Sequence, residues 1–124
     1  MNPEQQEALI KTYLSDKNKL YQDWYLEISQ PKLDKHVERY STPPKSPLEE
    51  LVQRFKNYFL EKQEYFKQKV CVEWEYSRKK EAYKNRSLLI AALSDFLVTV
   101  GIATISVLVS EGYLDSLCEN NSNG

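Results

Sequence analysis

An apolar run from Leu88 to Val109 constrains this fold more than any other feature of the sequence. The run contains a single charged residue, Asp95. Roughly 20 apolar residues in a helix are enough to cross a hydrocarbon core of about 30 Å. In lipid, a lone segment can satisfy its own backbone polar groups only as a helix. The length of the run therefore predicts one transmembrane helix, which we place at residues 88–110.

Charged residues are distributed unevenly on the two sides of this run. All 17 Lys and Arg and 14 of the 18 Asp and Glu lie in residues 1–87, so this part carries a net charge of about +3. In residues 88–124, all charged side chains are acidic. Such asymmetry places the basic side of a span in the cytoplasm. We therefore expect a single-pass membrane protein with a cytoplasmic N-terminus and a short polar tail, residues 111–124. The residues expected to set this topology and to contact lipid headgroups are Arg78, Lys79, Lys80, Lys84 and Arg86.

A first amphipathic helix is predicted over residues 3–29. Asn2, Pro3 and Glu4 supply an N-cap, a proline suited to the first turn and an acid near the positive end of the helix dipole. Apolar side chains then recur at spacings of three and four residues. Lys17 is the weak point of this stripe.

A second, longer helix is predicted over residues 47–85, after a proline-rich hinge at 41–47. Ser46, Pro47 and Glu49 fit a capping box with proline at the first helical position. The apolar stripe that follows resembles a coiled-coil seam. We expect the two helices to form a hairpin or a coiled coil. The side chains expected to contact a partner are Leu51, Phe55, Phe59, Tyr65, Phe66, Val70 and Trp74.

Small and hydroxyl side chains share one face of the predicted span. Such a stripe lets membrane helices approach closely, so we expect it to contact copies of the span or another membrane subunit. Asp95 stands out there, because an ionised carboxylate inside a membrane costs roughly 2.5 to 3.5 kcal/mol. A polar contact between spans, an interfacial position and the handling of ions or protons are its alternative roles. The face consists of Ala91, Asp95, Thr99, Ala103, Ser106 and Ser110.

Few residues in the sequence suggest a catalytic, cofactor-binding or metal-binding site. Cys71 and Cys118 are too few for a disulfide framework, and we interpret them as ordinary thiols. The only imidazole, His36, is expected to be a solvated surface residue. Neither a glycine-rich phosphate loop nor a nucleophile elbow occurs. We therefore expect a non-enzymatic protein with no cofactor, no metal and no small-molecule substrate. Because acids nearly balance bases in the second helix, we also expect no nucleic-acid partner.

The predicted fold class is all-α: two long amphipathic helices in a cytoplasmic region, residues 1–87, followed by a single C-terminal transmembrane helix. The function that fits is a membrane anchor, an adaptor or a small subunit of a membrane complex. Its partners would be membrane lipid and other protein subunits or a copy of itself. The first alternative is a soluble oligomeric helical interaction module, in which residues 88–109 form a buried core helix. The second is a pore-forming or holin-like effector.

Overall fold

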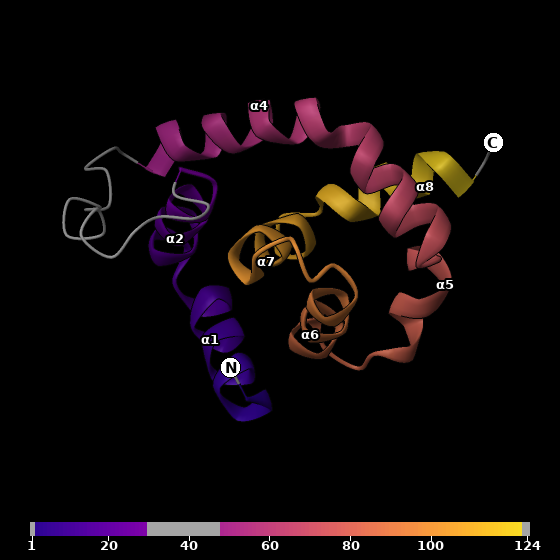
Figure 1. Ribbon diagram of the computed structural model, residues 1–124, viewed down its shortest axis with the longest axis horizontal. Helices are drawn as coiled ribbons and strands as arrows, with labels where there is room; N and C mark the ends of the chain where they lie inside the picture. The colour runs from indigo at the N-terminus through magenta and orange to yellow at the C-terminus, as the bar shows by residue number, and fades with distance from the viewer. Residues whose placement is uncertain (1, 30–47, 123–124) are drawn as a thin grey trace.

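The structure is a computed structural model that describes residues 2–29 and 48–122, and these residues form helices without strands (Figure 1). This confirms the all-α fold class. The expected hinge at 41–47 and His36 lie outside the described residues. In chain order the elements are α1 (Pro3–Ser15), α2 (Lys17–Ser29), α4 (Leu48–Phe66), the π-helix η1 (Lys67–Glu73), α5 (Tyr76–Lys79), the 3₁₀-helix η2 (Lys80–Ala82), α6 (Arg86–Phe96), α7 (Ile102–Ser110) and α8 (Tyr113–Ser122).

The first predicted helix is present as two helices. Asn2 caps α1 as expected, because its side chain accepts the backbone N–H of Gln5 at 2.8 Å. The helix then breaks at Asp16, whose backbone is extended. The Asp16 carboxylate accepts the backbone N–H of Lys19 at 3.1 Å, which is the hydrogen bond of an N-cap. The break therefore lies beside Lys17, the weak point of the apolar stripe.

The second predicted helix continues to Glu73 and then turns. Near its end the backbone N–H of Trp74 donates to the carbonyl of Lys69, the wider spacing of a π-helix. Glu75 then adopts a left-handed conformation with φ 59°, which a side chain disfavours. The straight rod of a coiled coil is therefore not formed. Instead, η1 and α5 curve around one side of the molecule (Figure 1).

The single helix expected over residues 88–110 is corrected to two helices, α6 and α7. The intervening turn, 97–101, consists largely of β-branched residues followed by Gly101, all with low helix propensity. At 1.5 Å per residue, each helix is roughly half as long as a hydrocarbon core of about 30 Å. Across residues 2–29 and 48–122, no helix combines the length and the apolar character that a membrane span requires.

Helix α7 lies at the centre of the fold. Every residue from 103 to 109 is buried, and α7 packs against α1, α2, α6 and α8. Figure 1 shows α6 and α7 enclosed by α1 and α2 on one side, α4 above and η1 with α5 on the other. Removing apolar area from water stabilises a fold by about 25 cal/mol per Å². The α7 part of the apolar run is thus hidden from water by the other helices of the same chain, whereas Leu88, Phe96 and Val98 remain exposed.

Aromatic side chains connect α4 to the helices beside it. The ring of Phe55 lies 4.9 Å from that of Trp24 on α2 and 5.0 Å from that of Tyr113 on α8. Phe59 is 4.8 Å from the same tyrosine ring. These tilted contacts between rings are worth about 0.5–1.5 kcal/mol each beyond their buried area. The apolar stripe of α4 therefore joins α2 and α8 over the core.

A disulfide joins Cys71 on η1 to Cys118 on α8, with their Cα atoms 5.1 Å apart. The expectation of two ordinary thiols was wrong. The two cysteines are 47 residues apart in the sequence, and they meet because η1 packs against α8. By the loop-entropy argument, a cross-link over such a distance stabilises a fold by about 4 kcal/mol.

Candidate functional site

The surface around the turn between α6 and α7 is the candidate functional site. Tyr65 is 41% exposed near the end of α4, Phe96 is 40% exposed at the end of α6, and Val98 is 79% exposed in the turn. Thr99 lies beside them and is also exposed. We call these four residues the turn face. Large apolar side chains gathered on one exposed surface are typical of contact with another molecule.

Two hollows flank Tyr65 on this surface, with volumes of about 270 Å³ and about 230 Å³. Small-molecule pockets usually measure about 300–1,000 Å³. Hollows of this size are better suited to individual side chains of a protein partner. The larger is lined by Tyr58, Lys62, Tyr65, Phe66, Thr99 and Val100, and the smaller by Tyr65, Lys69, Glu73, Phe96, Leu97, Val98 and Thr99.

Charges of both signs border the turn face. Lys69 and Glu73 form an ion pair at 3.4 Å. Lys62 lines the larger hollow, and Asp95 directly precedes Phe96 on α6. Both are exposed, and neither has an ionic partner in the part of the chain that the structure describes.

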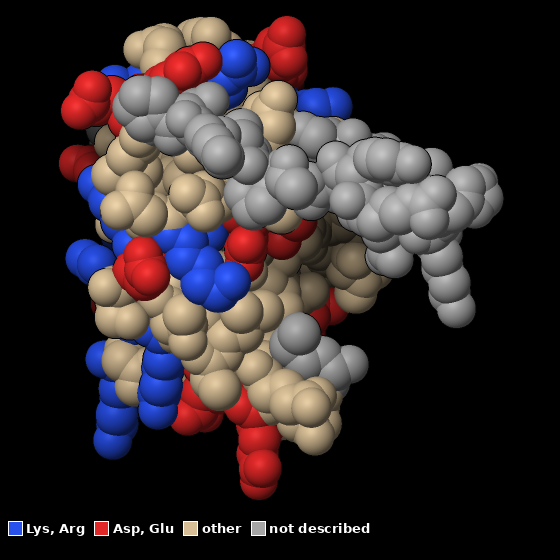
Figure 2. All heavy atoms as spheres, turned by 90° about the vertical axis from the view of Figure 1, so that its left-hand side faces the viewer, with Lys and Arg blue, Asp and Glu red and all other residues tan. Residues whose placement is uncertain are grey.

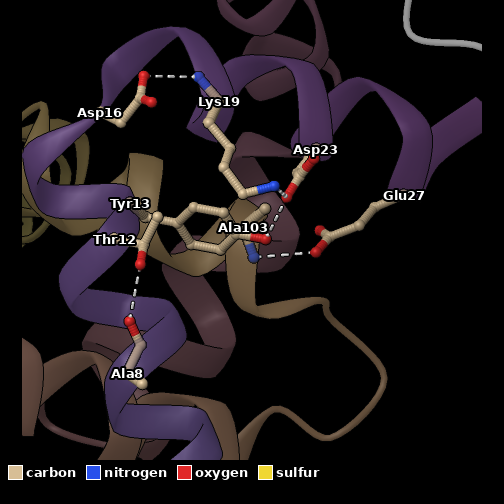
Figure 3. Close-up of polar contacts among 8 residues, drawn as sticks. All are labelled: Ala8, Thr12, Tyr13, Asp16, Lys19, Asp23, Glu27 and Ala103. Carbon is tan, nitrogen blue, oxygen red and sulfur yellow. Dashed lines mark hydrogen bonds and ion pairs between the residues drawn. The ribbon is translucent and has the colours of Figure 1, made fainter.

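Glu27 on α2 holds the start of α7, directly after the turn. Its carboxylate accepts the backbone N–H groups of Ala103 at 2.9 Å and Thr104 at 3.1 Å, and also the Thr104 hydroxyl at 2.9 Å. Figure 3 shows the Glu27 side chain reaching from α2 to the backbone of Ala103. The N-cap residue of α7 is Gly101, which has no side chain to satisfy these donors. Glu27 therefore caps α7 from another helix.

Burial sets the electrostatics of this cap. Loss of solvent raises the pKa of the Glu27 carboxyl, and the hydrogen bonds from Ala103 and Thr104 offset part of that rise. The backbone of Gly101 approaches so closely that a Cβ added there would overlap the Glu27 carboxylate. A side chain at this position would therefore force the Glu27 carboxylate to move.

Further polar contacts tie α1, α2 and α7 together. The Tyr13 hydroxyl donates to Asp23 at 2.8 Å, and Lys19 donates to the same carboxylate oxygen at 3.1 Å (Figure 3). Burial and the nearby Asp23 raise the pKa of the Tyr13 hydroxyl. Just beyond the other end of α7, the Tyr21 hydroxyl donates to Glu111 at 3.1 Å. Acidic side chains therefore fix both ends of α7 to α2.

The side chains predicted to contact a partner helix mostly face the core of this chain. Tyr65 is the one member that remains exposed, and it belongs to the turn face. Packing of α4 against α2, and of η1 against α8, contributes to burying the others in this conformation. The six buried members are Leu51, Phe55, Phe59, Phe66, Val70 and Trp74.

The structure separates the residues expected to share one face of a membrane span. Ala91 and Asp95 lie on α6, Thr99 lies in the turn, and the other three lie on α7. Asp95 and Thr99 are exposed, whereas Ala103 and Ser106 are buried. Ser110, at the end of α7, is half-buried.

The five basic residues expected at the membrane surface extend from α5 to the first residue of α6. Arg78 pairs with Glu75 at 2.9 Å, and the Lys79 ammonium lies 5.1 Å from the centre of the Trp74 ring. Both are local contacts on the surface, where ion pairs contribute little to stability. The other three, Lys80, Lys84 and Arg86, line a common groove.

Glu27 and the turn were missed by reasoning from sequence. A helical stripe shows only that Glu27 is polar, because the groups that donate hydrogen bonds to it, on Ala103 and Thr104, lie far along the chain. The low helix propensity between Val98 and Gly101 was the one available signal for the turn. The apolar character of the surrounding residues outweighed it.

No metal centre is evident in the described ranges, where no three His, Cys, Asp or Glu residues are grouped to hold an ion. On the visible part of the face that α1 and α2 present, acidic and basic side chains are both distributed (Figure 2). Neither sign gathers there into one large patch. Comparison with known proteins found no matching family model, no similar curated protein and no similar solved structure.

Proposed function

We propose that this protein is a non-enzymatic helical interaction module that associates with a second copy of itself through the turn face. The observation that supports this is the exposure of Tyr65, Phe96 and Val98 on one surface. Glu27 holds the adjoining end of α7 in place, so the apolar side chains are presented by a fixed backbone. A preorganised surface loses less conformational entropy on binding.

Charge complementarity favours a second copy as the partner. In a two-fold symmetric dimer, the same surface of each subunit meets its counterpart, so a residue pair occurs twice. The unpaired Lys62 lines one hollow of the turn face, and the unpaired Asp95 directly precedes Phe96 in the sequence. Pairing of Lys62 in each copy with Asp95 in the other would satisfy both charges. The net charge of −1 opposes association only weakly.

Sedimentation equilibrium of the full chain tests this proposal. The wild-type protein should show a concentration-dependent dimer, and Val98→Asp should weaken dimerisation at least tenfold. Leu60→Asp is the matched control, because Leu60 is 64% exposed and lines neither hollow. A wild-type monomer at all concentrations, or equal weakening by both variants, would overturn the proposal.

A charge swap provides an independent check of the pairing. Asp95→Lys alone places like charges together and should weaken the dimer, as should Lys62→Asp alone. The double variant should recover most of the lost affinity, because each copy again offers one cation and one anion. Losses that simply add in the double variant would exclude this arrangement.

Membrane anchoring through residues 88–110 is the second candidate function. The charge asymmetry supports it, since all Lys and Arg precede this segment. It ranks lower because α7 already serves as the core. Fractionation of the full-length chain without detergent tests it: recovery in the membrane pellet after carbonate extraction supports an integral anchor, and recovery in the supernatant opposes it.

A further inference from the structure

A groove separate from the turn face lies where η2 leads into α6 and approaches α8. Its volume is about 360 Å³. Lys80, Lys84 and Arg86 contribute three positive charges to its lining, and Glu81 and Asp115 contribute two negative charges. Leu89 and Val109 add apolar surface, and Tyr76 and Tyr83 also line the groove. The groove thus combines a cationic lining with a partly apolar one.

Internal pairing leaves this groove with uncompensated cations. Asp115 accepts the Tyr76 hydroxyl at 2.9 Å and the Lys80 ammonium at 3.1 Å, both at the same oxygen. Neither Lys84 nor Arg86 has a carboxylate partner among the described residues. Two exposed cations therefore remain available to an anion.

The position of Arg86 relative to Tyr76 supports this description. Burial and the bond to Asp115 raise the pKa of the Tyr76 hydroxyl, whereas the positive charge of Arg86 acts in the opposite direction. Arg86 and Tyr76 line the same groove. Arginine presents planar donors that match the oxygen geometry of phosphate.

We propose that this groove binds a phosphate group, as a monoester or diester, between Lys84 and Arg86. A phosphate oxygen can accept from both side chains at once. Three cations against two acids leave the lining with an excess charge of +1, which a diester of charge −1 balances and a monoester of about −1.5 to −2 exceeds only slightly. Leu89 and Val109, which line the same groove, offer apolar contact beside the site. The phosphate can therefore belong to a free anion or to a lipid headgroup, and the two sources are distinguished by experiment.

The test uses the full chain and two probes. Inorganic phosphate is titrated while backbone amide shifts of residues 83–89 are followed, and cosedimentation is measured with vesicles of phosphatidylcholine alone or containing phosphatidylglycerol. Lys84→Ala with Arg86→Ala should weaken binding at least tenfold. Lys11→Ala with Lys56→Ala is the control, since it removes the same charge elsewhere on the exposed surface. Glu81→Gln should tighten binding about twofold to threefold, because it removes the one unpaired acid that lines the groove.

Each outcome decides the proposal. Phosphate binding that is lost in the groove variant and kept in the control supports a site for a free anion. Binding only to phosphatidylglycerol vesicles, with the same dependence on Lys84 and Arg86, supports a headgroup site. Absence of binding to either probe, or equal weakening in both double variants, overturns the proposal. Matching circular dichroism and melting temperatures would exclude misfolding as the cause of a loss.

Discussion

The Glu27 carboxylate accepts the backbone N–H of Ala103 at 2.9 Å, although the two residues are 76 positions apart in the sequence. The contact matters because α7 begins in the interior, where its first N–H groups have no partner in their own helix. An unsatisfied buried donor costs about 1–3 kcal/mol. One carboxylate from α2 satisfies two such donors and thereby positions the most buried helix of the fold.

Replacement of Glu27 by alanine should destabilise the protein substantially. The backbone N–H groups of Ala103 and Thr104 would lose their acceptor, so we expect the free energy of unfolding to fall by about 1–3 kcal/mol. Urea denaturation followed by circular dichroism measures this. Glu7→Ala is a suitable control, because Glu7 forms only an exposed pair with Lys11 and its loss should cost under about 0.5 kcal/mol. Equal effects of the two substitutions would refute the capping role.

Substitution of Gly101 by alanine should disrupt the same cap. The added Cβ would displace the Glu27 carboxylate, so Gly101→Ala should cost about as much as Glu27→Ala. The two changes remove one interaction, and the double variant should therefore be little less stable than either single variant. A double-mutant cycle from urea denaturation reports this coupling. Additive losses would show that Gly101 acts independently of Glu27.

The buried Glu27 carboxyl should also make stability depend on pH. Because its pKa is raised in the folded state, the native protein binds the proton more tightly than the unfolded chain. Its contribution to stability is therefore largest below the unfolded pKa of about 4.3 and declines as the pH rises through the folded value. The difference in unfolding free energy between wild type and Glu27→Gln should fall as the pH is raised from 4. A difference that rises or stays constant would contradict the shift.

Local signals in the sequence predicted helix starts better than they predicted long-range contacts. Asn2 caps α1 as its position suggested, since an N-cap depends on neighbouring residues alone. The single helix expected over residues 88–110 was wrong, because the chain turns at 97–101 and forms α6 and α7 instead. A hydropathy pattern cannot show whether lipid or other helices cover a segment. In this protein α1, α2 and α8 pack against α7 and supply that cover.

Loss of the disulfide between Cys71 and Cys118 should lower stability without abolishing the helices. The cross-link restricts the unfolded chain, so replacing both cysteines by serine should lower the free energy of unfolding by about 4 kcal/mol. Thermal unfolding of wild type with and without a reductant should show the same difference. The Cys71→Ser, Cys118→Ser variant serves as the control, since reductant should leave its melting temperature unchanged. A wild-type melting temperature that is insensitive to reductant would show that the bond does not contribute.

Removal of the Ser106 hydroxyl should stabilise the protein. Ser106 is fully buried on α7, and its hydroxyl oxygen has no hydrogen-bond partner among the described residues. In the folded state this hydroxyl loses its hydrogen bonds to water and gains none in return, which destabilises the fold. Ser106→Ala should therefore raise the free energy of unfolding by about 1 kcal/mol. Ser110→Ala, at the half-buried end of the same helix, should change it by less than about 0.5 kcal/mol. Destabilisation by Ser106→Ala would contradict this prediction and would mean that the hydroxyl donates a hydrogen bond inside the core.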